Sequence, residues 1–264
     1  MMIPFAQIDA FADRPFTGNP AAVMPLDAWL DDAVLQAIAS ENNLSETAFL
    51  IPDGTGASDY ELRWFTPAAE VALCGHATLA SGHFVLSMDQ SLARVTFRTR
   101  QAGVLEVARH GADYALALPA WMPSKKALPA IIKALGIETP VETLWHDKGY
   151  ALVIVEDERT VRTLAPDMTA LSKCGDIVAI VSAPGEETDI VSRVFTPAFD
   201  IPEDPVTGSA HAVMVPWWAN RLERDTFVAY QASARGGYVG CRMAGERVIL
   251  TGNCISVIEG MFRL

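Results

Sequence analysis

The chain has 264 residues, half of them hydrophobic, and a formal net charge of −12. This length allows one large domain or two smaller ones, and the hydrophobic content excludes wholesale disorder. The acidic balance and the lack of any Lys/Arg cluster argue against a nucleic-acid partner, because phosphate backbones are bound by grouped cations.

The cysteines do not form a Cys-x-x-Cys pair, so neither a zinc ribbon nor a redox dithiol is expected. The first residues lack a basic segment followed by an apolar run, so no signal peptide is expected. No apolar stretch has the length that crosses a bilayer. We therefore expect a reduced, cytoplasmic protein without a membrane partner.

The first half of the chain predicts strands around two helices. One helix is expected over residues 28–40, with Asp27 as its N-cap and apolar residues four apart. A second is expected over residues 75–86, where small residues such as Gly82 allow close packing. The strands are predicted at 4–10, 21–24, 47–51, 60–65, 94–100, 104–109 and 114–118.

The second half repeats this rhythm after a proline-rich stretch that begins at Pro119. A helix over residues 130–135 should end at Gly136, and another over 209–219 should be kinked or shortened by Pro216. Each half is therefore mostly antiparallel sheet with a central helix, an α+β pattern. The strands are predicted at 150–155, 177–182, 189–195, 227–231, 238–243, 247–251 and 255–258.

One motif occurs twice. Arg-x-Phe-Thr-Pro-Ala stands at residues 63–68 and again at 193–198, 130 residues apart. Such long-range self-similarity indicates two pseudo-symmetric halves of one fold, since the period is too long for a solenoid. We place the first half at residues 1–118 and the second at residues 119–258.

Candidate chemistry follows each copy of the repeat. Cys74-Gly75-His76 stands at a helix start, where unpaired N–H groups and the helix dipole favour anions and thiolates. A buried, inert thiol at a capping turn is the alternative. The second copy continues through residues 203–211, which contain Asp204, Thr207, Gly208 and Ser209 at another helix start. Two such starts facing each other would form a small anion-binding cleft, whereas an N-cap role alone would account for only one of these side chains.

Glu46 precedes an apolar strand, although acidic residues are poor strand formers. Either it lies on an exposed face, or it is partly desolvated and moves protons near neutral pH. His76 and His83 lie seven residues apart, not the four typical of helical metal pairs, so no metal site is expected. No nucleotide-binding glycine loop occurs.

Together these motifs resemble the PhzF family of phenazine-biosynthesis-like proteins. The resemblance covers essentially the whole chain and rests on five ordered motifs, located at residues 17–23, 43–49, 65–78, 203–211 and 230–237. It implies the diaminopimelate-epimerase fold, in which each of two similar halves wraps a sheet around a central helix and the active site lies between them. It further implies that the last strand, residues 259–264, returns to the first half, and that the protein is a homodimer.

The resemblance also implies roles for individual residues. The family's best-studied member isomerises trans-2,3-dihydro-3-hydroxyanthranilate with a glutamate that moves a proton, and the matching residue here is Glu46. No metal or organic cofactor is implied. The matching substrate-binding positions are Gly75, His76, Asp204, Gly208 and Ser209, with Asn19 beside them.

Our leading hypothesis is a cofactor-independent isomerase of a small carboxylated metabolite, with Glu46 as the acid and base. An epimerase or racemase that uses Cys74 is a second hypothesis. It is disfavoured because two-thiol chemistry needs one cysteine per half, and no cysteine occurs between Cys174 and Cys241. A non-catalytic small-molecule binding protein is the third.

Overall fold

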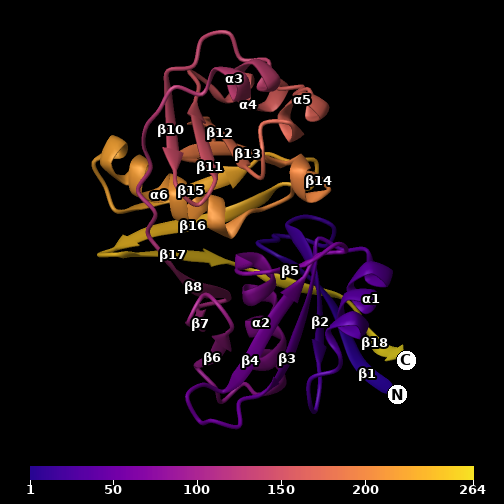
Figure 1. Ribbon diagram of the computed structural model, residues 1–264. Helices are drawn as coiled ribbons and strands as arrows, with labels where there is room; N and C mark the ends of the chain where they lie inside the picture. The colour runs from indigo at the N-terminus through magenta and orange to yellow at the C-terminus, as the bar shows by residue number, and fades with distance from the viewer. The chain divides into compact units, whose positions relative to one another are not determined.

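The computed structural model describes residues 1–264 and divides the chain into two compact units (Figure 1). The first unit contains residues 1–118 and 251–264, and the second contains residues 119–250. The sequence also places the division after Leu118, but it assigns only residues from about 259 onward to the returning segment. No helix is long and apolar enough to span a membrane.

The first unit is built on one mixed sheet. Its strands lie in the order β18-β1-β2-β3-β4-β6-β7-β8, with β5 beside β4. All neighbours are antiparallel except the pairs β2–β3 and β4–β6. The bounds are β1 Met2–Ala10, β2 Asn19–Pro25, β3 Glu46–Pro52, β4 Tyr60–Phe65, β5 Glu70–Val71, β6 Arg94–Thr99, β7 Val104–His110, β8 Asp113–Pro119 and β18 Cys254–Arg263.

Helix α2, Gly75–Met88, is the central helix of this unit, and strands β1, β2, β3, β6 and β7 all contact it. A Cβ atom added at Gly82 would lie 2.3 Å from the Val107 side chain, so the helix can approach β7 only with glycine there. The expected close packing of this helix is therefore confirmed. A curved sheet closed around one apolar helix buries the helix on nearly every side.

Helix α1, Asp32–Asn42, begins four residues later than expected. The predicted cap, Asp27, lies outside it, and Asp31 stands at the N-cap without a side-chain cap bond. Arg63 instead draws the first turn toward the sheet, since its Nη2 donates to Asp32 Oδ1 at 2.9 Å. The first turn of the helix thus contacts strand β4 through this ion pair. At the other end, Asn43 adopts a left-handed conformation at φ 49°, as expected for a helix stop.

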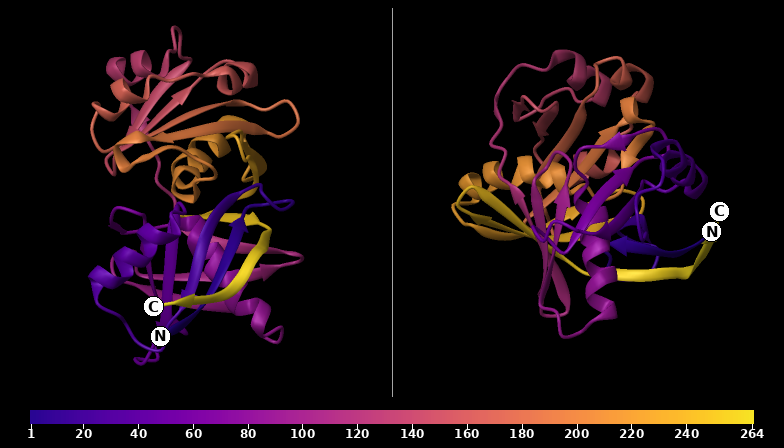
Figure 2. Two further views of the ribbon diagram at one scale, coloured as in Figure 1. Left: turned by 90° about the vertical axis from the view of Figure 1, so that its right-hand side faces the viewer. Right: turned by 60° about the horizontal axis from the view of Figure 1, so that its bottom comes forward.

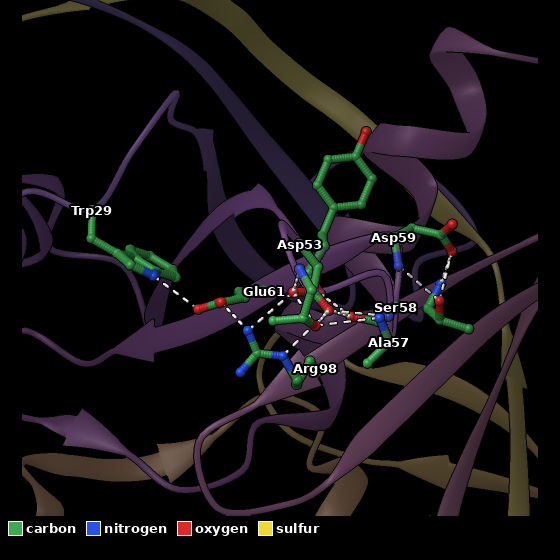
Figure 3. A network of polar contacts seen from close by, with 10 residues as sticks. Trp29, Asp53, Ala57, Ser58, Asp59, Glu61 and Arg98 are labelled. Carbon is green, nitrogen blue, oxygen red and sulfur yellow. Dashed lines mark hydrogen bonds and ion pairs between the residues drawn. The ribbon is translucent and has the colours of Figure 1, made fainter.

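A polar network holds the loop between strands β3 and β4 in place (Figure 3). The Asp53 carboxylate accepts hydrogen bonds from the backbone N–H groups of Thr55 and Ser58, at 3.0 and 3.1 Å. Arg98 lies between Asp53 and Glu61 and donates to both (Figure 3). The Arg98 guanidinium and these backbone bonds hold the pKa of Asp53 well below its usual range. This network has a structural role in holding the loop. It is not a ligand site, because its carboxylate oxygens already accept hydrogen bonds from the protein.

The second unit has the same plan. Its strands lie in the order β9-β10-β11-β12-β13-β15-β16, with β14 beside β13 and parallel pairs at β11–β12 and β13–β15. The strand bounds are β9 Ser124–Lys125, β10 Glu142–His146, β11 Tyr150–Ile154, β12 Val178–Pro184, β13 Ile190–Thr196, β14 Ile201–Asp204, β15 Thr226–Gln231, β16 Gly237–Ala244 and β17 Arg247–Gly252. The helix bounds are α3 Pro129–Leu135, α4 Glu158–Thr163, α5 Met168–Ser172, the 3-10 turn Pro197–Phe199, and α6 Gly208–Leu222.

Helix α6 runs unbroken through Pro216, so the predicted shortening is wrong. Proline has no N–H to donate to the carbonyl four residues earlier, which is that of Ala212. The Trp121 backbone N–H takes its place and donates to Ala212 O at 2.9 Å. The proline-rich stretch was expected to be only a linker. It also supplies the hydrogen-bond donor that the Ala212 carbonyl of helix α6 lacks. The C-terminal cap of α3 at Gly136, with φ 71°, is as predicted.

The repeat is visible as a duplicated ion pair. Arg63 binds Glu70 through Nε and Nη2, each at 2.8 Å. Arg193 binds Glu203 in the same two-pronged way, at 2.7 and 2.9 Å. In both units this pair ties the short strand before the central helix to the longer strand beside it. Bidentate arginine–carboxylate pairs fix geometry as well as charge.

The two chain ends lie together in the first unit. Strands β1 and β18 pair from Met2↔Arg263 to Ala10↔Cys254. The backbone N–H of Leu264 donates to Met1 O at 2.9 Å, and the N and C labels stand side by side in both views of Figure 2. The returning strand thus covers β1, which would otherwise be the edge of the sheet.

Candidate functional site

Strand register brings the predicted site residues of the first unit together at the ends of its central strands. Asn19 is the first residue of β2, and Ala21 pairs with Glu46, the first residue of the parallel strand β3. Strand β4 ends beside the start of β3, because Thr47 pairs with Phe65, the last residue of β4. The chain then passes through β5 into α2, whose first residues are Gly75 and His76. Segments distant in sequence thus meet at the start of the central helix.

Four side chains form a compact polar cluster there. His76 lies at its centre and is 3% exposed. Its Nε2 atom lies 2.9 Å from Glu46 Oε2, and its Nδ1 atom lies 3.1 Å from Asn19 Nδ2 and 3.5 Å from Cys74 Sγ. The Glu46 side chain is 12% exposed, so it is not the surface residue of the alternative interpretation.

The cluster sets the protonation of the histidine and the thiol. Burial by itself lowers the pKa of His76, but the neighbouring Cys74 and Glu46 outweigh burial and hold this pKa well above 6.5. Burial, reinforced by the Glu46 carboxylate, raises the pKa of the Cys74 thiol to about 11. The Glu46 carboxylate therefore favours the protonated form of both neighbouring groups, the imidazole and the thiol. The expectation that this helix start favours a thiolate is wrong, because burial and the adjacent carboxylate dominate.

The start of α2 is held from two sides. Cys74 is the N-cap residue, and its carbonyl accepts from the Thr78 hydroxyl at 2.5 Å. Upstream, Glu70 is fixed by the Arg63 ion pair. As at any helix start, the first N–H groups, here those of Gly75 and His76, lack intrahelical acceptors, whereas the Ala77 N–H contacts the Cys74 sulfur. Such groups favour an anion.

In the second unit the predicted residues stand at the corresponding helix start. Gly208 and Ser209 are the first residues of α6, and Thr207 is its N-cap. The Thr207 hydroxyl donates to Asp204 Oδ2 at 2.5 Å. The helix start and the acidic residue are thus in direct contact, as the spacing of the motif suggests.

Gln231 organises this turn and was not singled out from the sequence. It is fully buried on β15. Its Oε1 accepts from Thr207 N at 2.9 Å, and its Nε2 donates to Asp204 O at 2.7 Å and to Thr207 Oγ1 at 3.1 Å. In the sequence it stands within the motif at residues 230–237, and it is an amide residue between Tyr230 and Ala232.

The duplication does not repeat the carboxylate. In the first unit Phe65 pairs with Thr47, which follows Glu46, and in the second unit the matching Phe195 pairs with Ala179, which follows Val178. Val178 therefore stands where Glu46 would be. A group that can accept and return a proton at this strand start exists in the first unit only.

Comparison with known proteins identifies similar sequences along the whole chain. A family model described as phenazine biosynthesis-like protein matches residues 8–260. An uncharacterized isomerase of Pseudomonas aeruginosa is 46% identical over the full length of both chains. The human phenazine biosynthesis-like domain-containing protein is 36% identical, with 98% of this chain and 99% of the human protein covered.

Solved structures agree on the fold. A PhzF-family protein from Enterococcus faecalis has a TM-score of 0.91 and 42% identity, with complete coverage of both chains. A hydroxyproline epimerase from Agrobacterium vitis has a TM-score of 0.63 and 11% identity, with 98% of this chain and 92% of that one covered. The second likeness shows a shared fold only. The α+β fold with two similar halves of the diaminopimelate-epimerase type, expected from the sequence, is thereby confirmed.

Proposed function

Because this chain belongs to the phenazine biosynthesis-like protein family, whose bacterial relatives are named isomerases, we propose that it moves a proton on a small carboxylated metabolite without a cofactor. Glu46 is the acid and base of this reaction. The observation that carries the proposal is the pair between Glu46 and the buried His76, with Nε2 and Oε2 2.9 Å apart.

In the proposed reaction Glu46 accepts a proton from one carbon of the substrate. The C–H bond breaks, an O–H bond forms on the carboxylate, and the electron pair passes into the unsaturated system of the substrate. Glu46 then returns the proton to another carbon, so atoms and charge balance without an oxidant or reductant. A positioned carboxylate typically accelerates such a step by about 10² to 10⁴-fold.

The surroundings of Glu46 give the other residues their proposed roles. The His76 imidazolium orients the carboxylate and supplies positive charge where negative charge develops. The Asn19 amide lies 3.1 Å from the other ring nitrogen and borders the ring on that side. The N–H groups of α2 from Gly75 bind the substrate carboxylate. We also propose Asp204, Gly208 and Ser209 as substrate-binding residues, on the basis of the family resemblance.

An epimerase that uses Cys74 is the second candidate, since the fold is shared with epimerases. Racemisation by two thiols needs a second cysteine, and Thr207 stands at the N-cap position that corresponds to Cys74. A thiol whose pKa is raised to about 11 is also a poor base at neutral pH. Both features favour Glu46 over Cys74.

The experiment is a screen of carboxylated metabolites in deuterated water, read by mass spectrometry for deuterium incorporation and by NMR for its position. Glu46→Gln should lower exchange by at least about 10²-fold, because an amide cannot accept and return the proton. Glu106→Gln is the matched control, since Glu106 lies on β7 in an exposed pair with Arg94. Exchange by Glu46→Gln at the rate of the control would refute the assignment.

A further inference from the structure

Strand β18 is the outermost strand of the first unit's sheet, with β1 on its inner side (Figure 1). Edge strands are often protected from other chains by lysines, prolines or bulges. From Ile258 to Arg263 this strand has no lysine or proline, and its register with β1 is regular. We propose that this edge binds the same edge of a second copy of the chain, so that the two β18 strands pair antiparallel about a two-fold axis at Met261.

The register with β1 decides which backbone groups of β18 remain available. Met1 and Leu264 exchange two backbone hydrogen bonds, so they are a hydrogen-bonded pair of the ladder. In an antiparallel ladder such pairs alternate with pairs that exchange no hydrogen bonds. Met261 lies opposite Pro4, whose nitrogen has no hydrogen to donate, in agreement with this alternation. The backbone N–H and C=O groups that point away from β1, toward the open edge, are therefore those of Glu259, Met261 and Arg263.

A two-fold axis at Met261 uses all of these groups. Met261 then lies opposite the partner's Met261, and Glu259 lies opposite the partner's Arg263. By symmetry Arg263 lies opposite the partner's Glu259. Each of these pairs exchanges two N–H···O bonds, because its backbone groups face each other across the new ladder. The pairing is isologous, as a two-fold contact between identical chains requires.

Charge selects this register over the neighbouring ones. Glu259 and Arg263 are exposed and lie four residues apart, on the same face of the strand. With the axis at Met261, opposite charges face each other at both ends of the pairing, which stabilises paired strands. An axis at either charged residue would place like charges directly opposite. An axis at Gly260 or at Phe262 would place a charge opposite the apolar Met261.

Exposed apolar side chains surround the proposed contact. Several of them stand on the two paired strands and at their ends: Met1, Met2, Ile258, Met261 and Leu264. Contiguous exposed apolar groups are typical of surfaces that bind another protein. With the axis at Met261, Ile258 lies opposite the partner's Leu264, and the two Met261 side chains meet. The proposed pairing thus brings apolar groups together on both faces of the extended sheet.

Analytical ultracentrifugation of the full-length protein at about 1 to 100 µM tests the association, since a contact of this limited size should depend on concentration. We expect a monomer–dimer equilibrium. Glu259→Arg and Arg263→Glu should each raise the dissociation constant of the dimer at least about 10-fold, because each places like charges opposite. The protein with both substitutions has opposite charges again and should dimerise like wild type.

The matched control is Glu106→Arg, because Glu106 is an exposed charge on β7, an interior strand of the same sheet. It should associate like wild type. Circular dichroism verifies that each variant is folded, and the exposure of both charged residues of β18 predicts that the monomer is unaffected.

Cysteine cross-linking tests the position of the axis. Only a residue on the axis lies beside its own copy, so Met261→Cys should form an intermolecular disulfide on mild oxidation. Ile258→Cys is the control, since its two copies would lie about 20 Å apart along the strands, too far for a disulfide. Both substitutions are made in Cys174→Ser protein, because Cys174 is the one native thiol that is not buried.

A protein that stays monomeric at about 100 µM, with this edge open or covered by a different protein, would overturn the proposal. So would a dimer that the charge reversals leave unchanged, or one that cross-links through Ile258→Cys and not through Met261→Cys. Loss of the dimer in both single variants, its return in the combined variant and cross-linking at position 261 would establish the pairing. The test needs no substrate, so its result does not depend on the role proposed for Glu46.

Discussion

Cys74 and Thr207 occupy the same place in the two halves of this fold. Each is the N-cap residue of its unit's central helix, in an extended conformation with φ −138° and −111°, and each precedes the glycine that begins the helix. One is a buried thiol, and the other is a hydroxyl bonded to Asp204. The duplication has therefore kept the helix start and changed the chemistry presented there.

Replacement of Cys74 tests whether the thiol at the start of α2 takes part in the reaction. We predict that Cys74→Ser retains turnover within about 10-fold of wild type, because general acid/base work by Glu46 would account for the rate enhancement. The measurement is the rate of solvent-deuterium incorporation into the substrate. Near-total loss of exchange in a folded Cys74→Ser protein would favour the thiol epimerase instead.

The His76–Glu46 pair should make stability depend on pH. The pKa of His76 in the folded protein lies above its unfolded value of 6.5. The stabilisation is therefore fully present below about pH 6.5 and is lost as the pH rises through the folded pKa. Urea unfolding at about pH 6 and about pH 8.5 should show a decrease in the free energy of unfolding.

His76→Gln supplies the comparison for this measurement, because it removes the titrating group and keeps a polar side chain. Its free energy of unfolding should change less between the two pH values than that of wild type. An equal slope in the variant and in wild type would show that another group is responsible.

Much of this architecture follows from local patterns. The duplicated hexamer around Arg63 and Arg193 predicted two similar halves, and the small residues of α2 predicted its close packing. Gly136 and Asn43 ended helices where expected, since the need for a left-handed conformation is a local property. The glycines 75 and 208 were expected at helix starts, and both begin a central helix.

The predictions from the sequence failed where a residue's structure depends on a partner far away in the chain. Pro216 remains inside α6 because Trp121, far away in sequence, satisfies the carbonyl of Ala212. The start of α1 lies at Asp32, which binds Arg63 of strand β4. Gln231 looked unremarkable because its importance depends on Asp204 and Thr207, which only the fold brings to it. The protonation of Cys74 likewise depends on Glu46, a residue of another strand.

Phe16 carries backbone strain that a substitution should relieve. Its φ is 72°, a left-handed conformation that costs a bulky L-residue about 1 to 2 kcal/mol. Its N–H donates to Oδ2 of the fully buried Asp9 at 2.9 Å, and the residue is 72% exposed. Phe16→Asn should raise the free energy of unfolding by roughly 0.5 to 1 kcal/mol, because asparagine tolerates this conformation.

Phe16→Val is the counterpart in this test, since a β-branched residue is least suited to a positive φ. It should be less stable than Phe16→Asn in thermal and urea unfolding. If Phe16→Asn unfolds more easily than wild type, contacts of the ring contribute more than the strain removes.

Gln231 should be a positioning residue for the Asp204–Thr207 turn. It is fully buried, and its amide satisfies the Thr207 N–H, the Thr207 hydroxyl and the Asp204 carbonyl. Gln231→Leu preserves bulk but leaves a buried donor and a buried acceptor unpaired, at roughly 1 to 3 kcal/mol each. We therefore expect the free energy of unfolding to fall by roughly 2 to 4 kcal/mol.

The same substitution distinguishes positioning from bulk stability. If Asp204 binds substrate, displacement of its turn should raise KM more than it lowers kcat, measured below the unfolding temperature of the variant. Gln231→Glu should be intermediate, because its carboxylate can still accept from Thr207 N–H but cannot donate to the Asp204 carbonyl. Gln101→Leu is the control, since Gln101 is exposed in the β6–β7 loop of the first unit. Wild-type KM in a destabilised Gln231→Leu protein would reduce Gln231 to a structural role, and wild-type stability would contradict the network itself.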